Sequence, residues 1–86
     1  MGQDFYVVSA FIDYEGVHSQ WVYPSFDMAF DAYDAQCAGY RQARGEDDID
    51  AFVPDSLQLS GPYAWGEDIF QLGSASRRVL RSIDFR

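Results

Sequence analysis

The sequence predicts a small α+β fold, in which one amphipathic helix packs on a mainly antiparallel sheet. Three observations lead to this fold class. Apolar residues recur at helical spacing between residues 25 and 45. Two segments before that helix alternate in polarity and meet at a glycine, as the strands of a hairpin do. The 86 residues, 48% of them hydrophobic, are enough for a single domain over residues 1–86 with one modest core.

The helix is predicted over residues 25–45. Its apolar stripe has intervals of four, three, four and three residues, at Phe26, Phe30, Tyr33, Cys37 and Tyr40. Ser25 is a suitable N-cap, because its hydroxyl accepts a hydrogen bond from a free backbone N–H of the first turn. Gly45 provides the stop. Gly39 is a poor helix former, and we interpret it as a place where another backbone comes close.

The segment before the helix predicts a β-hairpin. Residues 5–14 alternate between a fully apolar face and a mixed face, and residues 17–23 return as the second strand. Glu15 and Gly16 lie at the tip, where glycine supplies a positive φ. Hairpin and helix then form a compact ββα unit, in which the helix lies across one face of the hairpin.

The segment after the helix predicts two or three shorter strands. Residues 57–60 are expected to be the third strand and residues 69–72 the fourth. Gly61 and Pro62 are a strong turn signal between them. Residues 63–66 fit either a strand end or an aromatic loop.

The C-terminal segment fits two structures. Residues 79–85 alternate as a strand does, whereas residues 75–83 also fit a helix capped by Ser74. Arginines at its start and Asp84 at its end oppose a helix dipole, which favours the strand. We expect that strand to pair with residues 69–72 across a loop at residues 73–76.

The net charge of −8 is distributed unevenly along the chain. Up to Ser76 there are thirteen acidic residues and only two arginines, whereas from Arg77 onward four arginines face Asp84 alone. Such an acidic body excludes direct binding of nucleic acid through its phosphates and disfavours an anionic membrane. Basic protein surfaces are its natural partners, and simple solubility is the alternative explanation.

No catalytic residue, metal site or cofactor is predicted. His18 is the only histidine and has no second ligand beside it in the sequence, and Cys37 lies in the apolar stripe of the helix. The acidic residues 46–50 lack the spacing of an EF-hand. We therefore expect a protein that is not an enzyme, and a small enzyme that uses paired carboxylates remains a third alternative.

The compartment predicted from the sequence is the cytoplasm. The chain has a single cysteine and no basic segment followed by an apolar one at its start. Its longest apolar run, residues 5–12, is too short to span a bilayer.

Carboxylates recur along one side of the predicted helix. Asp27, Asp31 and Asp34, which we call the acidic ridge, are four and three residues apart, so that their side chains lie about 6 Å from one another. Asp47, Asp48 and Asp50 are expected to extend it beyond the helix, and Asp47 and Asp48 are the two that we expect to contact a partner. This separation is of the same order as the spacing of phosphates along a nucleic-acid strand. The ridge is therefore a candidate phosphate mimic, and an ordinary solvated helix face is the alternative.

Aromatic residues are abundant for so small a core. Fifteen of the 86 residues are Phe, Tyr or Trp. Tyrosine and tryptophan are enriched at the energetic centres of protein interfaces, so we expect Trp21, Tyr23 and Trp65 to be apolar anchors beside the ridge. The alternative is that the aromatic residues thicken the core and close a homodimer.

The chain resembles the small acidic inhibitor proteins of phages and mobile elements, among them anti-CRISPR proteins. The resemblance lies in its size, its net charge, its ββα start (residues 5–44) and its acidic residues. The resemblance implies stoichiometric inhibition by occupation of a basic nucleic-acid site on a host complex. No residue role is carried over from it, and the arginine-rich C-terminus departs from a uniformly acidic mimic. The function we predict is accordingly a protein-binding inhibitor. The alternative is a homo-oligomeric accessory or structural protein with an aromatic self-association face.

Overall fold

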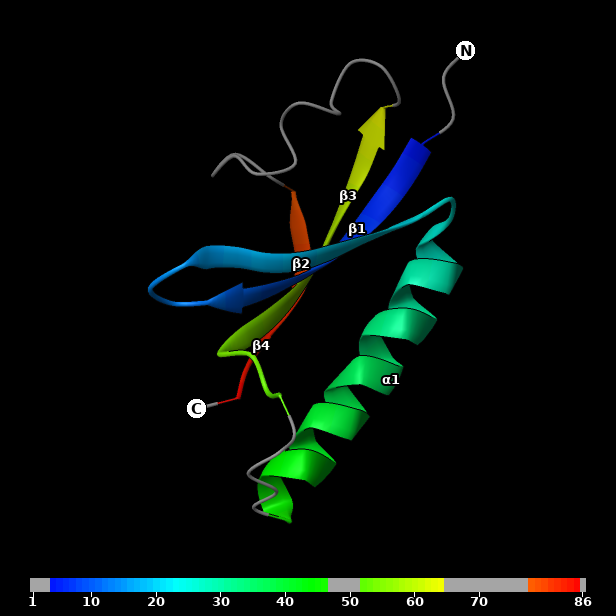
Figure 1. Cartoon of the computed structure of the whole chain (residues 1–86). Helices are drawn as coiled ribbons and strands as arrows, with labels where there is room; N and C mark the ends of the chain where they lie inside the picture. Colours follow the sequence, from blue (N-terminus) through cyan, green and yellow to red (C-terminus); the bar gives the residue numbers. More distant parts are fainter. Residues whose placement is uncertain (1–3, 47–51, 65–77, 86) are drawn as a thin grey trace.

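The computed structural model describes residues 4–46, 52–64 and 78–85 and has a helix on one face of a four-stranded antiparallel sheet (Figure 1). This confirms the α+β fold class. The elements, in chain order, are β1 (Asp4–Ile12), β2 (Gly16–Tyr23), α1 (Phe26–Gly45), β3 (Ser56–Ala64) and β4 (Val79–Asp84). The strand order in the sheet is β2-β1-β3-β4, so β2 and β4 form its two edges.

Helix α1 begins and ends where the sequence predicts. Ser25 is extended and its Oγ accepts a hydrogen bond from the Met28 backbone N–H (3.3 Å), as an N-cap does. The helix continues to Gly45. Gly39 does not mark a close approach of another part of the described chain, because a Cβ added there would have no other atom within 4 Å. That interpretation of Gly39 was wrong.

Strands β1 and β2 form the predicted hairpin. Gly16 has φ +82°, which explains the glycine at this position. β1 ends at Ile12, two residues before its predicted end, because the chain turns there: the Glu15 N–H donates to the Ile12 carbonyl (3.0 Å). The pairing shifts between Ala10 and the next residue of β1, which leaves His18 as the extra residue of a bulge in β2.

Strand β3 is longer than predicted, and the turn predicted at Gly61 and Pro62 was wrong. These residues lie inside the strand, joined by a cis peptide bond, and the strand pairs with β1 on both sides of them. Gly61 has φ +139° and lies at a shift of the β1–β3 register, where two residues of β3 oppose Tyr6. A glycine at such a bulge lets the strand bend and then continue, and a proline is tolerated where the regular ladder is interrupted.

Strand β4 confirms the strand predicted near the C-terminus. It pairs antiparallel with β3, with Leu57 opposite Ile83 and Ser56 opposite Asp84. The partner predicted for it, residues 69–72, lies outside the described residues, as do the loop at residues 73–76 and part of the 63–66 segment. Tyr63 and Ala64 belong to β3, so the strand-end interpretation holds for these two residues.

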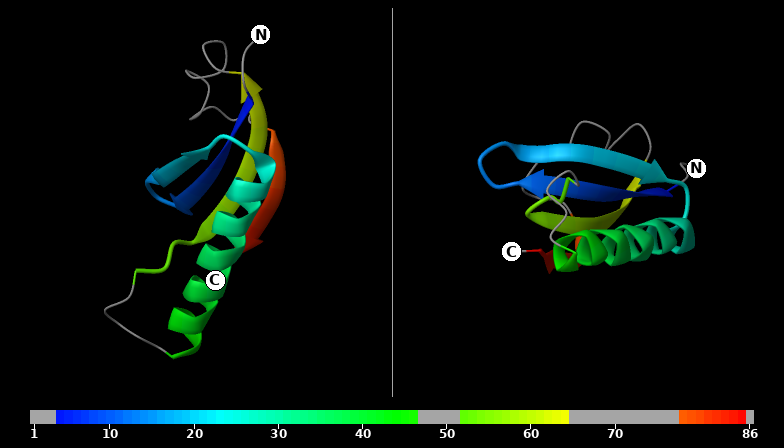
Figure 2. Two further views of the ribbon diagram at one scale, coloured as in Figure 1. Left: turned by 90° about the vertical axis from the view of Figure 1, so that its right-hand side faces the viewer. Right: turned by 60° about the horizontal axis from the view of Figure 1, so that its bottom comes forward.

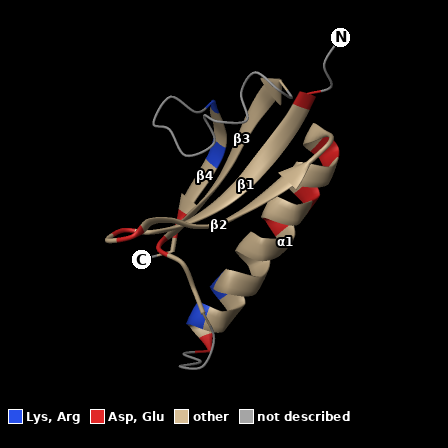
Figure 3. Cartoon of the chain, turned by 45° about the horizontal axis from the view of Figure 1, so that its top comes forward, with Lys and Arg blue, Asp and Glu red and all other residues tan. Residues whose placement is uncertain are grey.

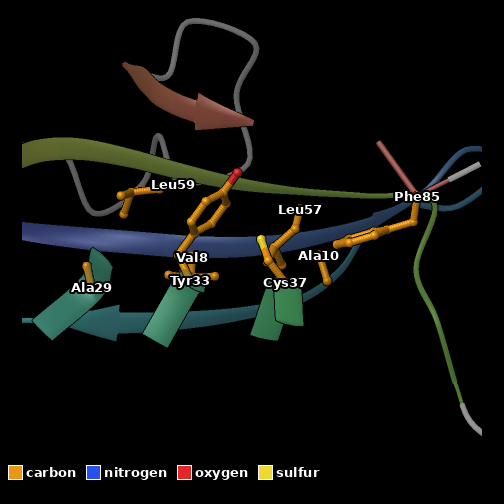
Figure 4. Close-up of a cluster of buried hydrophobic side chains, with 8 residues drawn as sticks. All are labelled: Val8, Ala10, Ala29, Tyr33, Cys37, Leu57, Leu59 and Phe85. Atoms are coloured by element: carbon orange, nitrogen blue, oxygen red, sulfur yellow. The ribbon is translucent and has the colours of Figure 1, made fainter. Parts of the chain in front are cut away.

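The core lies between α1 and the sheet. Its buried side chains, which we call the helix-face cluster, come from β1, β3, α1 and the residue after β4: Val8, Ala10, Ala29, Tyr33, Cys37, Leu57, Leu59 and Phe85 (Figure 4). The helix therefore packs on β1 and β3 together and not on the hairpin alone, as Figure 2 shows from two sides. Of the apolar face predicted for β1, Val8 and Ala10 are buried in this cluster and Tyr6 packs against it, whereas Tyr14 lies beyond the end of β1 and is exposed.

A second, smaller cluster lies on the other face of β1 and β3. Phe5, Val7 and Tyr63 are buried there, and the rings of Phe5 and Tyr63 lie 5.5 Å apart. Arg78 contacts it at Tyr63: its guanidinium lies 5.8 Å from the Tyr63 ring centre, and its Nη1 donates to the Pro62 carbonyl (2.6 Å). The guanidinium of this arginine therefore ties the start of β4 to the end of β3 through Tyr63 and Pro62.

Candidate partner-binding surface

The acidic ridge lies on the outer face of α1. Asp27, Asp31 and Asp34 are all exposed, whereas Ala29, Tyr33 and Cys37 of the same helix are buried against the sheet. Figure 3 shows the acidic side of the helix confined to its N-terminal half, with arginines in the C-terminal half. The periodicity of the sequence therefore places the three carboxylates correctly on one exposed face.

The charges of the ridge are not compensated by the described part of the chain. None of its three carboxylates forms an ion pair or a hydrogen bond with another described residue. Asp27 is stabilised by the helix dipole, because it lies in the first turn. Asp31 lies four residues after it, and like charges at this spacing destabilise a helix by about 0.2–0.5 kcal/mol. The ridge is thus an exposed, mutually repelling set of carboxylates.

The predicted extension of the ridge is not in the described structure. Asp47, Asp48 and Asp50 lie outside the described residues. Glu46 follows the helix directly and is exposed, and its Oε1 accepts from Gln42 Nε2 (3.0 Å). This local hydrogen bond holds Glu46 to the last turn of α1.

The predicted aromatic anchors differ in their surroundings. Trp21, on β2, has 36% of its surface exposed. Tyr23 is half-buried and packs against the helix-face cluster, and Trp65 lies outside the described residues. Of the two anchors that the structure describes, Trp21 is thus the one that offers exposed apolar surface.

The hairpin end carries exposed aromatic residues that sequence reasoning missed. Tyr14 is 86% exposed between Asp13 and Glu15, and the exposed ring of Phe52 stacks on His18 with ring centres 4.5 Å apart. Tyr14 was predicted as the last residue of the first strand, and the signal for its exposure was its place next to the predicted hairpin tip, where no neighbouring strand covers a side chain. The stacking of Phe52 on His18 joins segments 34 residues apart, and no local pattern predicts it.

Some kinds of site are absent from the described part of the protein. It contains no pocket, and within it no three His, Cys, Asp or Glu side chains are grouped so that they could hold a metal ion. Nor does any helix in residues 4–46, 52–64 and 78–85 combine the length and apolar character needed to cross a membrane.

Cys37 and Tyr33 lie side by side in the helix-face cluster. Burial raises the pKa of the Cys37 thiol above its ordinary value. Burial, followed by the neighbouring Cys37, raises the pKa of Tyr33 to about 12. Both groups are therefore neutral near pH 7, which is the state of packing residues and not of activated nucleophiles.

We expect Cys37 to react with iodoacetamide at pH 8 on the order of a thousandfold more slowly in the folded protein than in urea. The thiol is buried and its raised pKa lowers the thiolate fraction, so that reaction waits for unfolding. Because Cys37 is the only cysteine, mass spectrometry of the intact protein follows the reaction directly. Equal rates in buffer and in urea would show that the helix-face cluster does not cover this thiol.

Comparison with known proteins gives no match: no family model matches this chain, and no curated protein or solved structure does so.

Proposed function

We propose that this protein is a binding protein, not an enzyme, that occupies the basic surface of a nucleic-acid-binding protein and so blocks it. The observation that carries the proposal is the acidic ridge: Asp27, Asp31 and Asp34 are exposed along one half of α1 with no countercharge from the described residues. The resemblance to small acidic inhibitors of the anti-CRISPR type points in the same direction.

The geometry of the ridge suits a partner that binds phosphates. Neighbouring carboxylates on one helix face are about 5–6 Å apart, which is of the same order as the spacing of phosphates along a strand. A rigid helix holds them in fixed order, because its other face is packed on β1 and β3. The net charge of −8 adds long-range attraction toward a basic partner.

Trp21, on β2, is the apolar anchor that we propose beside the ridge. Exposed charges alone give little affinity, because salt screens them. A partly exposed tryptophan provides the large contact area that dominates many interfaces. The proposed surface therefore combines a charge pattern for recognition with one aromatic anchor.

Reversal of the ridge is expected to abolish partner binding and to leave the fold intact. We would immobilise the wild-type protein and the triple variant Asp27→Lys, Asp31→Lys, Asp34→Lys, and capture proteins from nuclease-treated host lysate. The expected result is a basic nucleic-acid-binding protein that wild type retains, that raised salt or an added oligonucleotide displaces, and that the triple variant captures at least tenfold less. Circular dichroism checks the fold of the variant.

A control variant separates the ridge from net charge. Asp4→Lys, Glu46→Lys, Asp84→Lys changes the charge by the same amount at exposed residues off the ridge. It is expected to capture the partner nearly as well as wild type. Equal losses in both triple variants, or full capture by the ridge variant, would refute the proposed role of the ridge.

The second candidate function, a homo-oligomeric accessory protein, is favoured by β4. This edge strand exposes Val79 (46%) and Leu80 (37%) beside Arg81, so it offers an apolar and basic surface to the acidic body of another copy. Sedimentation velocity at high protein concentration tests this alternative. A monomer throughout would exclude it, whereas a salt-sensitive dimer would support it.

A further inference from the structure

The outer edge of β2 is the part of the surface that the acidic ridge does not explain. β2 pairs with β1 on one side only, and in the described sheet no strand lies on its other side. An edge strand presents N–H and C=O groups at alternate residues, ready to pair with another extended chain. The bulge at His18 lies toward the hairpin tip, so the regular part of this edge is Ser19 to Tyr23.

Beyond the bulge at His18, this edge lacks charged residues and proline, which are usual protections against pairing. Natural edge strands carry charged residues or proline, which discourage the addition of another strand. β2 contains no Asp, Glu, Lys, Arg or Pro, although 23% of the protein's residues are charged. The opposite edge, β4, has Arg81 and Asp84 within it and Arg78 just before it. Of the two edges, β2 is therefore the one suited to accept a strand.

Apolar side chains flank the edge on both faces. Trp21 (36% exposed) and Val22 (42% exposed) are consecutive residues of a strand, so they project to opposite faces of the sheet. An added strand would bury apolar surface on both sides, besides forming main-chain hydrogen bonds. The main-chain hydrogen bonds would give affinity for any extended segment, and the apolar flanks would favour a segment with apolar side chains.

Acidic residues lie at both ends of the same edge. Asp13 and Glu15 are in the turn just before β2, and Asp27 and Asp31 are in the first turns of the helix just after it. Figure 3 shows the uncharged β2 between these two acidic ends. The segment that fits is therefore apolar in its middle and basic at both ends.

A second copy of this chain does not fit the edge. In an antiparallel β2–β2 pair, the acidic turn of each copy would lie beside the acidic helix start of the other. In a parallel pair, each acidic end would lie beside its equivalent. Like charges in such positions repel, which disfavours self-pairing.

From this placement we infer that the outer edge of β2 binds an extended segment of the partner protein as an added strand, apolar in the middle and carrying Lys or Arg at both ends. The inference rests on the proposed function and specifies how the partner is held. An added strand of five to eight residues would bring its basic ends to the acidic turn and to the start of the acidic ridge.

A designed peptide tests the edge without knowledge of the partner. The probe is acetyl-Lys-Lys-Val-Thr-Val-Thr-Val-Lys-Lys-amide, titrated to millimolar concentration into the ¹⁵N-labelled full chain. The expected result is a saturable shift of the β2 resonances and at least tenfold slower hydrogen exchange at those amides between Ser19 and Tyr23 that point away from β1. The same peptide with Glu for every Lys, or with Pro for its central Val, is expected to leave both unchanged.

Matched valine variants locate the binding strand. Val22→Lys places a charge on the proposed edge and is expected to weaken peptide binding at least tenfold, whereas Val79→Lys, at a similarly exposed valine of β4, is expected to leave it unchanged. No saturable shift at β2, shifts at β4 instead, or equal effects of the two variants would overturn the inference. If the peptide does not bind β2 but partner capture from lysate still depends on the acidic ridge, the inference fails and the proposed function stands. If the peptide binds β2 but partner capture does not depend on the acidic ridge, the proposed function fails and β2 is still a strand-binding edge.

Discussion

Replacing Gly61 with alanine is expected to destabilise the protein by about 3 kcal/mol. Its φ of +139° lies in a region that side chains rarely adopt, and holding a residue in such a conformation costs about 1–3 kcal/mol. A Cβ at this position would also lie 2.6 Å from Tyr6 Cδ2 and 3.1 Å from the Phe5 carbonyl oxygen. Since the Tyr6 ring packs edge-on against Phe26 at the start of α1, relief of the clash disturbs that contact. Urea unfolding followed by circular dichroism measures the loss.

The same substitution at Gly39 is expected to stabilise the protein by about 1 kcal/mol. Gly39 lies inside α1 on its exposed side, and an added Cβ would have no other atom within 4 Å, so only helix propensity changes. The two Gly→Ala variants should therefore move the urea midpoint in opposite directions. A Gly61→Ala protein as stable as wild type would show that the shift in the β1–β3 register does not depend on this glycine.

Gly61 also shows why the C-terminal half of the fold was harder to predict than the first half. The hairpin and α1 are determined by signals within a few residues of each element: the glycine at the hairpin tip, the Ser25 cap and the stripe of α1. Gly61 and Pro62 have the composition of a turn, but their conformation depends on pairing with β1, more than 50 residues earlier. No local pattern contains that information.

The candidate surface was likewise predictable only where the signal in the sequence is local. Exposure of the acidic ridge follows from helical spacing alone, because the buried stripe fixes which side of α1 faces away from the sheet. Trp21 and Tyr23 share one face of β2, yet only Tyr23 packs against the helix-face cluster. That difference depends on where α1 crosses the sheet. The position of β2 at the edge depends on the strand order, which the sequence does not reveal.

Replacing Leu59 with alanine is expected to cost about 3–4 kcal/mol. Leu59 is fully buried in the helix-face cluster, where it lies on β3 near the Tyr33 ring of α1 (Figure 4). Removal of a buried leucine side chain loses its transfer free energy and leaves a cavity, together about 2.7–5 kcal/mol. A domain of this size has a total stability of roughly 4–13 kcal/mol, so the variant loses a large part of it. Thermal unfolding should show a midpoint lower by more than about 10 °C.

Leu80 provides a control with the same chemistry and a different environment. It lies on β4 with 37% of its surface exposed, so Leu80→Ala removes the same atoms but leaves no enclosed cavity. Its expected cost is below about 1 kcal/mol, because much of the side chain already contacts water. The difference between the two variants therefore measures how firmly α1 closes over β3. Equal, small losses would mean that the helix does not cover Leu59, and the acidic ridge would then have no rigid support on the sheet.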